Sequence, residues 1–183
     1  MDERLNNLRK QRIKGTEDVN ILLAVDHSDA SRKAVDFAGE VLGKTDSGGI
    51  AVTLLHVVES LPDYLLNRVT DENVSSADKQ VADEWTENDR AKGEELLAES
   101  KRHLVDQGVG ETTIETKLLV KSGTPEARKV VAALAIIEQM KQGPYDVVCL
   151  VRRGFAAAAG SFLGSVAEKV LREAAGKTVW VVD

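Results

Sequence analysis

Five short apolar runs alternate along the chain with longer segments in which apolar residues recur every three or four positions. The runs are rich in Val, Leu and Ile and cover residues 21–26, 50–58, 114–120, 146–151 and 178–182. Short apolar runs bounded by turn residues are typical of strands that are buried on both faces. Their alternation with helical segments predicts a mostly parallel sheet covered on both faces, an open doubly wound α/β fold.

Helices are expected between these strands wherever the apolar positions follow a helical period. The pattern predicts helices over residues 31–42, about 87–107, about 125–141 and 165–175. Start and stop signals agree with these bounds, because Thr124 precedes Pro125 at one predicted start, and Gly43, Gly108 and the pair Gly143-Pro144 follow three of the predicted ends.

Two segments fall outside this alternation. Residues 1–19 carry mixed charge and few apolar side chains, which predicts a tail or a short surface helix. Residues 61–84 are polar and acidic and contain Pro62, which predicts a loop or a poorly packed insertion. At roughly 150 residues per domain, the 183 residues therefore form one domain over 20–183 that follows an N-terminal tail.

Composition excludes several classes of function. Lys and Arg number 24 against 30 Asp and Glu, and a net charge of −6 disfavours binding to nucleic acid or to anionic lipid. No apolar stretch approaches the roughly 20 residues that span a bilayer, and the first residues lack the apolar core of a secretory signal. The single cysteine, Cys149, rules out an intrachain disulfide and reads as a small core residue. We therefore expect a cytoplasmic protein that binds neither nucleic acid nor membrane.

The loops that follow the first and fourth strands are the best candidates for a ligand site. In open α/β sheets, ligands bind outside the carboxyl ends of the strands. The first of these loops begins at Asp26, and the second runs from Arg152 to Ser165 and is rich in glycine. Ser165 opens a predicted helix whose free N–H groups favour a phosphate. Ser165 and Glu168 also form an S-x-x-E capping box, which explains both residues without a ligand.

Signals for catalysis are weak. The histidines and the cysteine are too scattered in sequence to suggest a metal site, and no nucleophile elbow or P-loop lysine is present. His56 lies among apolar residues and is expected to be packed and hydrogen-bonded. No catalytic residue is therefore predicted.

Four segments of the chain resemble the universal stress protein family. They are residues 20–26 (NILLAVD), 52–57 (VTLLHV), 123–127 (GTPEA) and 164–171 (GSVAEKVL), and order and spacing agree over roughly residues 20–182. The resemblance implies a Rossmann-like sheet of strand order 3-2-1-4-5. It also implies a regulatory or protective module that acts through binding, with at most slow hydrolysis of ATP.

The nucleotide-binding branch of that family carries the motif G-x2-G-x9-G-S/T. Gly154, nine further residues and then Gly164-Ser165 fit its second half, whereas Val151 stands at the position of the first glycine. The resemblance implies that Asp26 and Val57 hold the adenine. It implies that Gly154, Gly164, Ser165 and Val166 contact the ribose and phosphates, with Mg²⁺ or Mn²⁺ bridging the phosphates of ATP.

Val151 leaves two alternatives open, because a β-branched side chain neither takes a positive φ cheaply nor makes room for a nucleotide. Either ATP binds, or Val151 closes the site and the chain is an interaction module without a nucleotide. A third hypothesis is an ATP-using enzyme of a related nucleotide-binding α/β family.

The final apolar run, Val179 to Val182, is expected at a sheet edge. Bare edges invite pairing, and pairing with the same strand of a second copy gives a two-fold homodimer. The family resemblance implies the same arrangement, and further protein partners are compatible with it. The alternative is that the N-terminal tail or the acidic insertion covers this edge.

Overall fold

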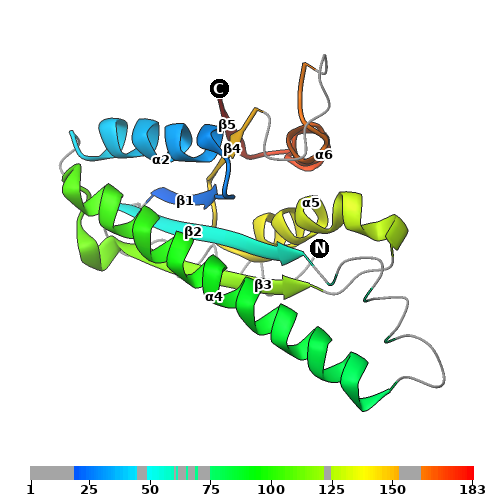
Figure 1. The fold of residues 1–183 in the computed structure, drawn as a ribbon. Helices are drawn as coiled ribbons and strands as arrows, with labels where there is room; N and C mark the ends of the chain where they lie inside the picture. Colours follow the sequence, from blue (N-terminus) through cyan, green and yellow to red (C-terminus); the bar gives the residue numbers. More distant parts are fainter. Residues whose placement is uncertain are drawn as a thin grey trace.

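A sheet of five parallel strands forms the middle layer of the molecule, as Figure 1 shows. The computed structural model describes residues 19–44, 49–59, 61, 65, 69, 75–121, 125–152 and 162–183. The strands are β1 (Val19–Ala24), β2 (Ile50–Glu59), β3 (Ile114–Lys121), β4 (Val147–Val151) and β5 (Thr178–Val182). Their order is β3-β2-β1-β4-β5, and every neighbouring pair is parallel. The predicted fold and strand order are confirmed.

Helices cover both faces of this sheet. They are α2 (Asp29–Leu42), α4 (Ser76–Asp106), α5 (Pro125–Gln142) and α6 (Ser165–Glu173), and a short 3-10 turn, η1 (Glu111–Thr113), precedes β3. Helices α2 and α4 pack against one face, and α5 and α6 pack against the other. The layers arise because β-to-α-to-β crossovers between parallel strands are right-handed, so the face that a helix covers depends on the direction of the crossover.

Two apolar clusters fill the spaces between the sheet and its helices. Along β1, Ile21 and Leu23 point into the cluster under α2 and α4, whereas Leu22 points into the cluster under α5 and α6. This alternation is the two-residue period of a strand. Cys149 on β4 is fully buried in the first cluster, so its interpretation as a core residue is confirmed.

Helix α4 begins earlier than the sequence pattern suggested. The expectation of a loop up to residue 84 is wrong from Ser76 onward, because α4 starts there with Ser75 as its N-cap, the Ser75 hydroxyl accepting from the N–H of Asp78 at 3.0 Å. The first turns of α4 extend past the ends of β2 and β3 (Figure 1). Ala82 is the only buried residue of α4 before Gly93 among those the structure describes. A helix that packs on little has no apolar stripe to reveal it.

Several predictions fall on residues outside the described part of the chain. They include the tail up to residue 18, most of residues 62–74, and Gly154. Within the described part, no helix is both long enough and apolar enough to cross a membrane.

Candidate functional site

The carboxyl ends of β1 and β4 lie side by side at one edge of the sheet. The two strands are parallel neighbours, with Leu23 opposite Cys149. From this edge the chain leaves β1 for α2 on one face and leaves β4 for α6 on the other face. Such a reversal of direction opens a crevice outside the strand ends, where ligands of open α/β sheets bind.

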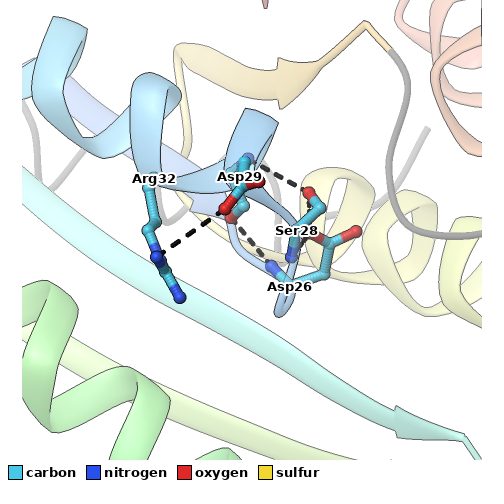
Figure 2. Close-up of polar contacts among 5 residues, drawn as sticks. Asp26, Ser28, Asp29 and Arg32 are labelled. Atoms are coloured by element: carbon cyan, nitrogen blue, oxygen red, sulfur yellow. Dashed lines mark hydrogen bonds and ion pairs between the residues drawn. The ribbon is translucent and has the colours of Figure 1, made fainter.

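The turn after β1 is fixed by a closed set of hydrogen bonds around Asp26 (Figure 2). One carboxylate oxygen of Asp26 accepts from the N–H of Ser28 at 2.9 Å and from the Ser28 hydroxyl. The same hydroxyl accepts from the N–H of Ser31 at 3.1 Å and caps α2. The Ser31 hydroxyl in turn accepts from the N–H of Asp26 at 2.9 Å. These bonds hold the carboxylate at the rim of the crevice before any ligand arrives.

The three valines expected near the ligand do not share one face of the sheet. Val57 on β2 and Val166 on α6 both pack against the cluster under α5 and α6. Val151 packs against the opposite cluster, under α2 and α4. It is the last residue of β4 and pairs in register with Val182, so its backbone is extended, which suits a β-branched residue.

Helix α6 begins at this edge, and its N-cap is Gly164, with Ser165 as the first helical residue. Within the described part of the chain, no side chain caps this helix. The capping-box interpretation of Ser165 and Glu168 is therefore wrong, because the serine of such a box must itself be the N-cap. Glu168 pairs instead with Arg172 at 2.7 Å. The N–H of Gly164 donates to the carbonyl of Arg152 at 2.8 Å, which ties the start of α6 to the end of β4.

Arg152 lies beside this crevice with its guanidinium engaged by the protein. One terminal nitrogen is 2.6 Å from a carboxylate oxygen of Asp183, and the other donates to the carbonyl of Phe162 at 3.4 Å. The guanidinium carbon also lies 5.7 Å from the centre of the Phe162 ring. Arg152 thus joins the end of β5 to the segment before α6.

His56 has the packed role expected for it. The residue is buried, and its Nδ1 donates to the carbonyl of Val25 at 2.8 Å. Burial lowers the pKa of His56, because the charged ring would lose hydration. The ring of His27 meets it edge-on, with 5.3 Å between ring centres. His56 therefore supports the backbone immediately before Asp26.

A cavity of about 300 Å³ lies between α2 and α4, and Asp26 is one of its lining residues. No sequence pattern indicated this cavity. Its walls come from segments more than fifty residues apart in the sequence, so only the fold brings them together. Among the residues that the structure describes, no three His, Cys, Asp or Glu side chains are grouped to hold a metal ion.

Fold and crevice together define a doubly wound α/β domain with its two central loops at a topological switch point. The model of the universal stress protein family matches residues 19–183, and the chain belongs to this family. A search of the curated proteins finds no match.

Solved structures of universal stress proteins share the fold at low sequence identity. UspA from Lactobacillus plantarum is 20% identical with a TM-score of 0.64, and the match covers 92% of this chain and 100% of that one. A universal stress protein in complex with cAMP is 20% identical with a TM-score of 0.56, covering 91% and 98%. A family member from Arabidopsis thaliana with AMP bound is 18% identical with a TM-score of 0.55, covering 90% of each chain.

Proposed function

We propose that this domain is a regulatory or protective module that binds ATP at the crevice between β1 and β4. The observation that carries the proposal is the meeting of the Asp26 turn and the uncapped N-terminus of α6 at one edge of the sheet. The free N–H groups and the dipole at the start of a helix favour a phosphate. The relatives solved with cAMP and with AMP support an adenine nucleotide as the ligand.

In this proposal each predicted residue except Val151 has a part. Asp26 and Val57 hold the adenine, while Gly154, Gly164, Ser165 and Val166 contact the ribose and phosphates. Mg²⁺ or Mn²⁺ would accompany the bound ATP, take most of its ligands from phosphate and water, and offset the phosphate charge. Binding is the purpose of the site, with at most slow hydrolysis, and we place its action in the cytoplasm.

The placement of Val151 supports an open site. Its side chain packs under α2 and α4, whereas Val57 and Val166 pack on the opposite face of the sheet. Its extended backbone also needs no glycine. We therefore expect Val151→Gly to lower stability without strengthening the binding of ATP.

Thermal unfolding with and without Mg-ATP tests this function. ATP at 100 times its dissociation constant should stabilise the wild-type chain by about 2.7 kcal/mol. Ser165→Asp should reduce the stabilisation, because a carboxylate at the first helical position suits the helix but repels phosphate. Asp29→Asn is the matched control, since Asp29 lies in the first turn of α2 with its side chain exposed. A wild-type protein that ATP does not stabilise, or a Val151→Gly variant that alone gains binding, would favour the interaction module without nucleotide.

We propose further that the chain pairs with a second copy through β5. Among the described strands, β5 is an edge with β4 as its only neighbour, and Val181 is exposed there. Beside it, the ring of Trp180 meets the exposed Phe37 edge-on, with 5.8 Å between ring centres. An unprotected apolar edge favours strand pairing.

Native mass spectrometry tests the dimer and reports any co-purified nucleotide in the same measurement. Val181→Lys should give a monomer, because a charged side chain on an edge strand opposes pairing. Glu111→Lys, an exposed change outside β5, should leave the dimer intact. A wild-type monomer would leave β5 free for another protein partner.

A further inference from the structure

The cavity of about 300 Å³ between α2 and α4 lies on the face of the sheet opposite to Val57 and Val166. Val35 from α2 and Leu96 from α4 are its apolar lining residues. Val35 is buried in the cluster under these two helices, and Leu96 packs against the same cluster. The volume matches the lower end of the range for small-molecule sites, which begins at about 300 Å³.

Two buried serines, Ser31 and Ser100, bring hydroxyl groups to this cavity. The Ser31 hydroxyl accepts from the N–H of Asp26. Ser100 is 8% exposed, and its hydroxyl can donate to and accept from a ligand in the cavity.

The charges around the cavity favour a cation. Asp26, Asp36 and Glu99 line it, against Arg32 and His103. His103 is paired with Asp36, and Arg32 is largely exposed and 3.6 Å from Asp29. Glu99 has no ion-pair partner in the described part of the chain, so its negative charge is available to a ligand.

We propose that this cavity is a second ligand site, which takes a small organic ammonium ion with an apolar body. The apolar body contacts Val35 and Leu96, the ammonium group pairs with Glu99, and the Ser100 hydroxyl accepts one of its N–H bonds. The site shares Asp26 with the nucleotide crevice but goes beyond the proposed function, because its other lining residues belong to α2 and α4, whereas the crevice uses the loops at the strand ends and the residues of the opposite face.

Titration of the ¹⁵N-labelled full chain, followed by NMR, tests the site with 2-phenylethylammonium as the probe. Amide signals of α2 and α4 should shift. The neutral isostere 2-phenylethanol should bind about fivefold more weakly, which is the upper range for one partly exposed ion pair. Glu99→Gln should weaken ammonium binding by the same factor and leave alcohol binding unchanged. Glu95→Gln, an exposed neighbour that does not line the cavity, is the matched control.

Ser100→Leu should fill the cavity and remove the binding of both probes. Because Ser100→Leu also changes the packing of α2 against α4, the Glu99→Gln comparison tests the proposal without relying on that variant. Equal binding of ammonium and alcohol, equal effects of Glu99→Gln and Glu95→Gln, or unshifted α2 and α4 signals would overturn the proposal. A parallel titration with Mg-ATP separates the two sites, since loss of one response with retention of the other identifies which proposal fails.

Discussion

The Nδ1 atom of His56 lies 2.8 Å from the carbonyl oxygen of Val25, so β2 supports the backbone just before Asp26. Titratable groups face the ring from two elements: Asp26 and His27 from the turn after β1, and Asp89 from α4. The two acids raise the pKa of His56 and His27 lowers it, but burial is the largest influence and lowers the pKa below its ordinary value of 6.5.

This lowered pKa makes stability depend on pH. The unfolded chain binds a proton at His56 more readily than the folded chain does, so the free energy of unfolding is highest above pH 6.5 and falls as the pH drops below it. His56→Asn keeps a donor near the Nδ1 position but cannot titrate. Denaturant unfolding at a series of pH values should therefore give a flatter profile for this variant. Glu95→Gln should keep the wild-type slope, and an unchanged slope in His56→Asn would contradict the assignment.

Gly93 of α4 is so close to the sheet that a larger residue does not fit. A Cβ atom at this position would lie 2.7 Å from Cδ2 of His56 and 2.7 Å from Cδ1 of Leu118. The His56 ring cannot turn away without losing its bond to Val25. Overpacking of this kind costs about 1–3 kcal/mol, which opposes a helix-propensity gain of about 1 kcal/mol for alanine.

We therefore expect Gly93→Ala to be neutral or destabilising by up to about 2 kcal/mol, where propensity alone predicts stabilisation. Chemical denaturation measures the change. Glu95→Ala, two positions along the same helix and exposed, should stay within about 0.5 kcal/mol of the wild type. A Gly93→Ala chain stabilised by the full propensity difference would show that α4 moves away from the sheet at little cost.

Cys149 should be inert in the folded protein. It is fully buried on β4, and burial raises the pKa of its thiol to about 12. Only the thiolate reacts with disulfide reagents, so labelling requires unfolding. The rate of reaction with a chromogenic disulfide should rise with urea in parallel with the unfolded fraction. Rapid labelling of the native protein at neutral pH would mean that β4 opens locally.

The order of layers was predictable because it depends on patterns that are local in sequence. Each strand is a short apolar run, and each of the first four is followed by a helical period or a turn signal. The first part of α4 was missed because it lacks such a local apolar pattern. Residues 76–84 pack on few apolar neighbours, so their helicity is supported by the Ser75 cap and by contacts such as that from Gln80 to Glu84, which leave no apolar stripe in the sequence.

Parts of the candidate site depend on structural details that the pattern of apolar and polar residues does not determine. Asp26 and the start of α6 were expected at one edge, and parallel neighbouring strands place them there. The capping box failed by one residue, since α6 starts at Ser165 and its cap is Gly164. The packing of Val151 depends on which face β4 presents at its end, and the cavity beside Ser100 depends on how α2 meets α4. These are properties of tertiary packing.

The ion pair between Arg152 and Asp183 links the residue after β4 to the residue after β5. The pair spans 2.6 Å, and the N–H of Arg152 also donates to the carbonyl of Val182 at 2.6 Å. The Arg152 side chain is 23% exposed and that of Asp183 is 64% exposed, so water screens the pair in part. A double-mutant cycle with Arg152→Gln and Asp183→Asn should give a coupling of about 0.5–1 kcal/mol.

Hydrogen exchange of the β5 amides should quicken in either single variant. Arg172→Gln, which breaks an exposed pair on α6, should leave β5 exchange unchanged. Additive effects of the two substitutions would show that the Arg152–Asp183 pair contributes no coupling.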